Sequence, residues 1–354
     1  MKPMFQTLSD HNAFLRRSFR ATRGVYPRLF LFLSFLVGLS ACQTSEKSIF
    51  TISERDRPIY ARLIAEPDSV HYFTSFDLTR LAYREVLPAS FNTLLVFIHG
   101  TAAQSKLYLP LADTLRQYGI ATALLDLRGH GLSEGRRGDA KNTTALARDL
   151  KLFLDTLRAK YPQKKLVLGG HSLGAGACLK YISFFYDRPS HYRPPDALLL
   201  MSGGFYPNPN RSSKTLLNTR QQDGAFAKVN PLQSLLLIPD LLLDIHPKAF
   251  EILLPNDSLV QQAVSKNLLT THYALNFFLA AFPIDVMDAY RNVRFPTLLV
   301  IGKDDELFAV ADAEYTLSRL PTKEKSLIVS DANHINVIWR SAPAIATWLQ
   351  SLQL

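Results

Sequence analysis

Cysteine is nearly absent from this chain of 354 residues, which contains only Cys42 and Cys178. A scaffold stapled by several disulfides is therefore excluded, because such proteins are short and rich in cysteine. The chain has an ordinary globular composition, with 47% hydrophobic and 20% charged residues. That composition and length predict either one large α/β domain with an insertion or two small domains.

A concentrated basic surface is also lacking, although the formal net charge is +10. Residues 1–41 hold six basic side chains and one acidic side chain, so they carry half of this surplus. The other half is spread thinly, without the basic stripe interleaved with aromatic residues that is typical of nucleic-acid-binding proteins. We therefore expect no nucleic acid among the partners.

The apolar run near the N-terminus is too short to span a bilayer comfortably, since it extends only from Leu29 to Ala41. Because it follows a basic stretch, it is typical of a secretory signal peptide. Its end, LSAC at 39–42, resembles the bacterial lipoprotein box, in which the cysteine is lipidated. This resemblance implies a signal peptide over 1–41, a membrane anchor on Cys42 and a tether over 42–49.

Two alternatives to lipidation stay open, an uncleaved anchor helix and an ordinary signal peptide. If the lipoprotein resemblance holds, the protein is anchored to a membrane of the bacterial cell envelope. Gln43 stands where an aspartate is associated with retention in the inner membrane. The resemblance therefore favours the outer membrane.

The segment that follows has the rhythm of a parallel sheet. Runs of alternating polarity between Ile49 and Glu85 predict an opening antiparallel pair. Apolar strands and amphipathic helices then alternate from Leu94 to Ser202, and this rhythm returns from Thr297 to Leu352. Near-continuous apolar strands separated by helices indicate a parallel sheet that is covered on both faces.

An insertion interrupts this rhythm between Phe205 and Arg294. It contains leucine-rich segments that predict helices at 231–243 and 259–279, and it shows no clear strand. We interpret it as a helical lid over the carboxyl ends of the strands, where open α/β folds bind ligands. The predicted core therefore has two parts, 50–205 and 295–354, separated by a lid at 206–294.

The sequence GHSLG at 170–174 has the context of a nucleophile elbow, the tight turn that exposes a catalytic serine. An apolar strand precedes it and helix-compatible sequence follows. In such a turn the residues two before and two after the serine must be nearly without side chains, and Gly170 and Gly174 meet that demand. The predicted nucleophile is Ser172.

A serine nucleophile needs a base, and the base needs an acid that orients it. In this type of sheet the order along the chain is serine, acid, histidine. His334 follows a late strand and is the predicted base. Asp305, in the turn after the strand Thr297–Ile301, is the predicted acid, with Asp304 as the alternative.

Two further groups complete the predicted site. Backbone N–H groups should stabilise the oxyanion, and the best candidates are those of Leu173, directly after the nucleophile, and Thr101, after the strand that ends at Ile98. His99 is expected to bond loop backbone rather than to act as a base. Glu306, next to the predicted acid, is expected to face solvent.

Five motifs together resemble the α/β-hydrolase superfamily: HG at 99–100, DLRGHGLSEGRRGD at 126–139, GHSLG at 170–174, GKDD at 302–305 and the late His334. Within it they are similar to the monoacylglycerol lipase and lysophospholipase branch, which is often grouped with serine aminopeptidases. The resemblance covers Leu78 to Leu352. One departure is the run Thr-Ala-Ala-Gln after Gly100, where related sequences are richer in glycine.

The resemblance implies an α/β-hydrolase fold, with a mostly parallel eight-stranded sheet, helices on both faces and a helical lid. It also implies a Ser-His-Asp triad, no metal, no organic cofactor and hydrolysis of small amphipathic esters. Three alternatives keep the triad: a thioesterase, an acyltransferase, or an aminopeptidase that binds the substrate amine through Asp244, Glu251 or Asp257. A fourth is a binding lipoprotein without activity, and the sequence sets no oligomeric state.

Overall fold

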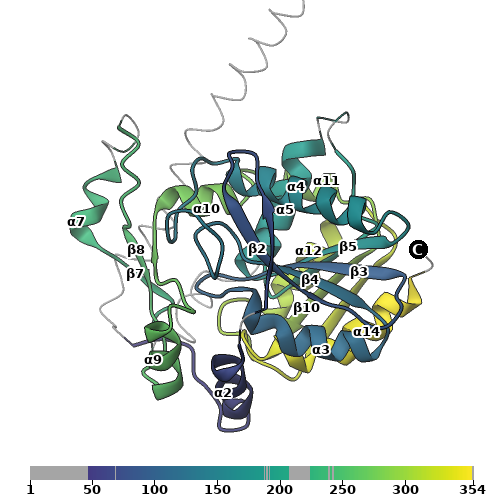
Figure 1. Cartoon of the computed structure of the whole chain (residues 1–354), viewed down its shortest axis with the longest axis horizontal. Helices are drawn as coiled ribbons and strands as arrows, with labels where there is room; N and C mark the ends of the chain where they lie inside the picture. The colour runs from purple at the N-terminus through teal and green to yellow at the C-terminus, as the bar shows by residue number, and fades with distance from the viewer. Residues whose placement is uncertain are drawn as a thin grey trace, which may run out of the picture. The chain divides into compact units, whose positions relative to one another are not determined.

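The strands gather into two sheets in the computed structural model (Figure 1), which describes residues 47–67, 69–186, 188, 190, 192–206, 224–237, 240 and 243–352. The larger sheet has eight strands. From one edge to the other they are β1 (His71–Thr74), β2 (Arg80–Val86), β4 (Ala121–Leu125), β3 (Thr93–Ile98), β5 (Lys165–His171), β6 (Ala197–Met201), β10 (Thr297–Gly302) and β11 (Lys325–Ser330).

This large sheet is mostly parallel, as the sequence predicts. Only β2 runs against its neighbours, pairing antiparallel with both β1 and β4. The other neighbouring pairs are parallel. The central strands are buried along almost their whole length because helices cover both faces, which explains their unbroken apolar sequences.

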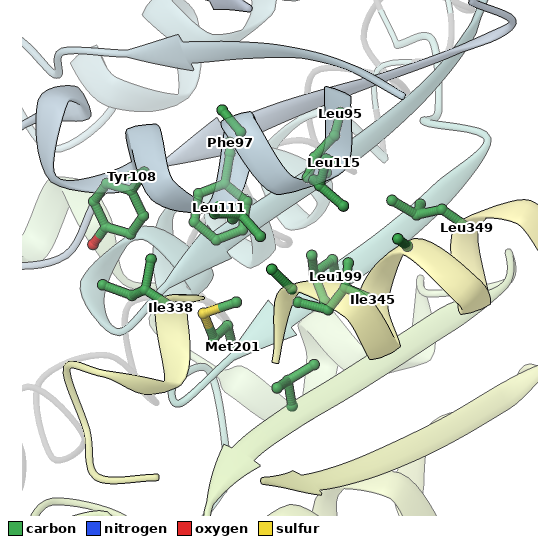
Figure 2. Packing of buried hydrophobic residues seen from close by; sticks show 14 of the residues in the cluster. Leu95, Phe97, Tyr108, Leu111, Leu115, Leu199, Met201, Ile338, Ile345 and Leu349 are labelled. Carbon is green, nitrogen blue, oxygen red and sulfur yellow. The ribbon is translucent and has the colours of Figure 1, made fainter. Parts of the chain in front are cut away.

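One face of the sheet carries a large apolar core. It is covered by α3 (Leu109–Gln117), α13 (Val337–Arg340) and α14 (Ala342–Ser351), with the 3-10 turn η1 (Ser105–Tyr108) at the start of α3. Figure 2 shows side chains of β3 and β6 meeting those of α3 and α14. The other face is covered by α4 (Ala145–Lys160), α5 (Leu173–Tyr186) and α12 (Val310–Arg319). The buried Cys178 lies in α5.

The lid between β6 and β10 is not purely helical. Its described part contains α7 (Pro231–Ser234), α9 (Ser258–Ser265), α10 (Leu275–Ala281), α11 (Val286–Arg291) and a second sheet of β7 (Ala227–Val229), β8 (Phe250–Ile252) and β9 (His272–Tyr273). The expectation of a lid without strands is therefore wrong. Strands of two or three residues are too short to show an alternating pattern.

The predicted lid helix at 259–279 is also wrong in part. It is divided into α9 and α10, with β9 between them. Asn267, just after α9, has a φ of +59°, a left-handed conformation that ends a helix. Residues 207–223, 238–239 and 241–242 of the predicted lid lie outside the described residues.

The N-terminal part of the described chain differs from the expectation as well. A helix, α2 (Arg57–Ala65), precedes the two predicted strands. The end of the expected tether is paired with the lid, because Ile49 N–H donates to Ala225 O (3.2 Å) and Ala225 N–H donates to Lys47 O (2.7 Å). The predicted signal peptide at 1–41 and Cys42 lie outside the described residues. Across the part of the chain that the structure describes, no helix has both the length and the apolar character needed to cross a membrane.

Candidate active site

Ser172 stands at a sharp turn between β5 and α5. Its φ is +53°, a left-handed conformation that is strained for serine and common at functional turns. A Cβ on Gly174 would lie 2.2 Å from Ile98 O, and one on Gly170 would lie 2.3 Å from the Gly174 carbonyl carbon. Both predicted glycines are therefore required by close backbone contact. Gly203, which the sequence analysis did not select, is equally required, since its Cβ would lie 2.3 Å from Ser172 O.

The structure brings Asp305 and His334 together. His334 Nδ1 lies 3.1 and 3.0 Å from the two carboxylate oxygens of Asp305, and both residues are buried. Burial raises the pKa of Asp305, but the adjacent imidazole and a hydrogen bond from Phe308 N–H outweigh it and lower that pKa below its usual value. Asp305 is therefore a carboxylate at neutral pH. The alternative acid, Asp304, is exposed.

Two neighbours hold the backbone of His334. Its N–H donates to Glu306 Oε2 (2.9 Å), and its carbonyl accepts from His171 Nε2 (2.8 Å). Glu306 is half-buried, so the expectation that it faces solvent is wrong. Burial lowers the pKa of His171 to about 3, so that its ring is neutral at physiological pH. Neither role was visible in the sequence, because backbone hydrogen bonds leave no pattern.

The two predicted oxyanion donors lie at the start of a helix and in a loop, respectively. Leu173 is the first residue of α5, so its N–H has no acceptor within the helix. Thr101 lies between two residues whose N–H groups are already used: Gly100 donates to the Tyr108 hydroxyl (2.8 Å) and Ala102 donates to the Tyr273 hydroxyl (2.7 Å). Among the described residues the Thr101 N–H has no partner, which leaves it available to a substrate oxygen.

Each of these two tyrosine hydroxyls also contacts a buried histidine. Tyr108 lies 2.9 Å from His171 Nδ1, and Tyr273, which comes from β9 in the lid, lies 2.8 Å from His130 Nε2. The loop at 100–102 is thereby held from the core on one side and from the lid on the other. Sequence reasoning missed both tyrosines, and Tyr273 is 171 residues away from the N–H that it binds.

His99 has the structural role that the sequence predicts. Its Nδ1 lies 2.9 Å from Gly100 O, and its Nε2 accepts from Leu127 N–H (3.0 Å). Both ring nitrogens are therefore occupied by backbone groups. Burial lowers the pKa of His99, which keeps the ring neutral.

Ser172 and His334 open into one apolar cavity of about 160 Å³. Thr101 lines the same cavity, so the predicted nucleophile, base and one oxyanion donor face a shared space. The rest of the lining is mostly apolar and comes from residues 50–64, from the lid and from core residues at 100–108 and 335, with Gln104, Lys106 and His171 among its polar members. Among the described residues no aspartate or glutamate lines it. The arrangement suits a substrate with an apolar group next to the bond that reacts.

Sequence and structure comparisons place these features among known proteins. The family described as serine aminopeptidase, S33, matches residues 89–334, which is more than half of the chain. The monoglyceride lipase homolog of monkeypox virus is 24% identical over 70% of this chain and 83% of its own length. The monoglyceride lipase of Rattus norvegicus is 28% identical, over 36% of this chain and only 40% of its own length.

Solved structures agree on the fold. A soluble variant of monoglyceride lipase from Saccharomyces cerevisiae, in complex with a substrate analog, has a TM-score of 0.59 and 18% identity. It is matched over 81% of this chain and 96% of its own. A monoacylglycerol lipase from Paleococcus ferrophilus has a TM-score of 0.52 and 19% identity, over 77% of this chain and 98% of its own. With the eight-stranded sheet, these structures show that the chain has the α/β-hydrolase fold. The match over residues 89–334 shows that the chain belongs to the serine aminopeptidase S33 family.

Proposed function

We propose that the protein is a serine hydrolase that cleaves carboxylic esters through an acyl-enzyme on Ser172. His334 takes the proton of the serine hydroxyl as it attacks the ester carbonyl, and Asp305 orients the imidazole and stabilises its positive charge. The N–H groups of Thr101 and Leu173 stabilise the oxyanion. His334 then protonates the departing alcohol. Water repeats the cycle on the acyl-enzyme and releases the acid.

One observation carries this proposal: Ser172, at a strained turn, shares an apolar cavity with His334, whose Nδ1 lies 3.0 Å from the buried Asp305. A serine without a base is a poor nucleophile. A buried carboxylate beside an imidazole holds that imidazole in the orientation that a base requires. Such a set at the carboxyl ends of parallel strands is the usual architecture of a hydrolytic site in this fold.

The lining of the cavity favours an ester over a peptide with a free amine. An aminopeptidase needs a carboxylate to bind the substrate's ammonium group. The three candidates from the sequence do not line the cavity, and each has a basic partner elsewhere: Asp257 with Arg57, Asp244 with His246, and Glu251 with Lys228. An apolar wall without a carboxylate suits an acyl chain.

We further propose monoacylglycerols and similar amphipathic esters as the substrate class. Two features support this choice, the apolar cavity and the similarity to proteins named monoglyceride lipase. A glycerol ester places its acyl chain in the apolar space and leaves its hydroxyl groups toward water. A thioesterase or an acyltransferase would use the same reacting groups on another leaving group or acceptor.

A fluorophosphonate labelling experiment tests the function. We expect wild-type protein to be labelled and Ser172→Ala protein not to be labelled. Turnover is then compared on monoacylglycerols, acyl thioesters and aminoacyl amides, with and without an alcohol acceptor. Amide cleavage with negligible ester turnover would replace the esterase by the peptidase. Absence of label in the wild type would leave only the binding lipoprotein.

We also propose that Cys42 is lipidated and holds the protein in the bacterial cell envelope, in the outer membrane where the cell has one. The support is the run Leu29–Ala41 followed directly by cysteine. Expression with a radiolabelled fatty acid tests this proposal. Wild-type protein should carry label and fractionate with membranes, whereas Cys42→Ser protein should lose the label. A Cys42→Ser protein that is still lipidated would refute the assignment.

A further inference from the structure

Residues 50–64 contribute one wall of the cavity, although they precede the family-matched segment, which begins at residue 89. Five apolar or aromatic side chains of this stretch line the cavity: Phe50, Ile52, Tyr60, Leu63 and Ile64. Leu63 and Ile64 lie on α2 and are 6% and 8% exposed. This wall therefore lies outside the segment that the family model matches.

The segment reaches the reacting groups themselves. The Phe50 ring is stacked on the His334 imidazole, with ring centroids 5.7 Å apart and planes inclined by 20°. Phe50 also meets Phe226 of the lid edge-on, at 5.9 Å. The stacked ring covers one face of the imidazole and is itself part of the cavity lining.

The start of α2 is anchored to both the core and the lid. Asp56 accepts from Asn336 Nδ2 (3.0 Å) and Trp339 Nε1 (3.2 Å), which lie directly after the His334 loop. Arg57 forms an ion pair with Asp257 of the lid, at 2.5 Å. The two adjacent residues Asp56 and Arg57 thereby connect the start of α2 to both the core and the lid.

The other end of α2 is held by two lysines. Lys106, in η1, donates to Glu66 O (2.6 Å), and Lys266, after α9, donates to Ile64 O (3.2 Å). Cations at a helix C-terminus bind its free carbonyls and offset its dipole. With both ends fixed, the cavity-facing side of α2 is a rigid surface.

A rigid apolar wall limits how much of a chain the cavity encloses. Figure 1 shows α2 beside α9, whose Leu259, Val260 and Ala263 line the facing side. A volume of about 160 Å³ is close to that of an engineered protein cavity of about 150 Å³ that binds benzene, so it encloses a group of about six carbons. Longer chains must extend past the side chains of α2 and α9.

We propose that Leu63 and Ile64 of α2 determine specificity, by setting the acyl chain length that the enzyme hydrolyses best. The substrates would be esters of medium-chain acids, with about six carbons enclosed. This inference rests on the proposed esterase function. To that function it adds the identity of the side chains that select among esters.

Matched substitutions on one helix test the inference. Ile64→Ala enlarges the cavity and Leu63→Phe reduces it, whereas Ile59→Ala changes a half-buried isoleucine of the same helix that does not line the cavity. kcat/KM is measured on p-nitrophenyl esters of two to sixteen carbons. The ratio of long-chain to six-carbon turnover comes from a single preparation, so a reduced folded fraction cancels.

We expect Ile64→Ala to raise this ratio and Leu63→Phe to lower it, each by roughly tenfold or more, because one methylene in an apolar pocket changes selectivity by about that factor. Ile59→Ala should leave the ratio within about twofold of wild type. Unchanged ratios in both cavity variants, or an equal change in Ile59→Ala, would overturn the inference while the esterase function stands.

A binding experiment separates failure of the inference from failure of the function. The same variants are titrated with fatty acids of six to sixteen carbons, which needs no turnover. If wild-type protein hydrolyses no ester and takes no fluorophosphonate label, the proposed function fails. The chain-length dependence of fatty-acid binding then still supports or refutes the role of α2.

Discussion

The two walls of the cavity are built in different ways. The wall with Ser172 and His334 is attached to strands of five to seven residues in register with buried neighbours. The opposite wall is made of α2, α9 and the three-residue strand β8. Asp56 joins this wall to the core, and Arg57 joins α2 to α9 within it. Groups that react must be placed within about half an ångström, which strand register provides. An acyl chain needs only apolar surface of the right volume, which short helices provide.

Removing the charge of the buried acid should have the largest effect on the core wall. Asp305→Asn keeps the shape but favours the wrong histidine tautomer, and in a related triad this lowers kcat by about 10⁴-fold. Asp304→Asn is the matched control, since Asp304 is exposed and adjacent. Steady-state turnover of a short ester measures both. Equal losses in the two variants would contradict the assignment of Asp305.

Removing one lid hydroxyl should show that the lid positions the core loop. Tyr273→Phe leaves the buried Ala102 N–H without an acceptor, which costs about 1–3 kcal/mol of stability. A loosened loop misplaces the Thr101 N–H, so we expect kcat to fall by about 10- to 100-fold with little change in KM.

The control for this experiment is Tyr290→Phe, another buried tyrosine of the lid, whose hydroxyl donates to Gly204 O (2.5 Å). Urea unfolding and kinetics are measured on both variants. Tyr290→Phe should lose stability and keep its kcat. If both variants lose kcat alike, the effect is one of general stability and Tyr273 has no positioning role.

A third experiment tests how the contribution of the lid residue His246 to folding stability depends on pH. His246 lies between Asp139 Oδ2 (2.9 Å) and Asp244 Oδ1 (2.6 Å). Burial lowers the pKa of His246, but the two carboxylates outweigh it and raise that pKa above its usual value. A raised pKa stabilises the folded state fully below the unfolded pKa of about 6.5, and this contribution is lost as pH rises through the folded pKa.

We therefore compare the unfolding free energies of wild type and His246→Gln. Wild type should be the more stable of the two, and the difference should be largest at about pH 6 and smallest at about pH 9. Denaturant unfolding over this range measures the difference. His272→Gln, at an exposed histidine of the same lid, is measured alongside as the matched substitution. A gap that widens with increasing pH would contradict the sign.

The ion pair between α2 and α9 should give the smallest effect. The side chains of Arg57 and Asp257 are 29% and 18% exposed, so water and salt screen their attraction. A double-mutant cycle with Arg57→Gln and Asp257→Asn should give a small favourable coupling, because ion pairs near the surface contribute little to stability. Asparagine keeps the N-cap of α9, so the cycle isolates the pair. A coupling of zero at low salt would show that α2 and α9 are held together without it.

The sequence predicted the large sheet because its strands are long and apolar, and it predicted the elbow because GHSLG is a local motif. Local order favoured Asp305 over Asp304, which stayed open as the alternative because both follow the same strand. The fold separates them, by burying Asp305 against His334 and exposing Asp304. The catalytic roles of Ser172, Asp305, His334, Thr101 and Leu173 remain predictions, as does lipidation of Cys42.

The parts that could not be predicted depend on distant contacts or on very short elements. Tyr273 contacts Ala102 from another part of the chain, and the strands of the lid have too few residues for an alternating pattern. The helix α2 is a different case. Its Pro58 near the N-terminus and its apolar residues spaced by four, from Ile59 to Leu63, are a recognisable helix signal that the expectation of strands obscured.

The two tyrosine hydroxyls on either side of Thr101 also have hydrogen bonds of fixed direction. The carbonyl of His334 accepts, so His171 carries its proton on Nε2 and its Nδ1 must accept from Tyr108. The same argument applies to His130, whose Nδ1 faces a carbonyl and whose Nε2 must accept from Tyr273.

Each hydroxyl therefore receives an N–H from the loop and gives its only proton to a neutral ring, so neither has a proton left for a substrate oxygen. For Tyr108 this direction persists down to the pKa of His171, about 3. The donor that the loop offers to a substrate is therefore the backbone N–H of Thr101, which lies between the two hydroxyls. A backbone N–H can only donate, so the direction of this hydrogen bond does not change with pH.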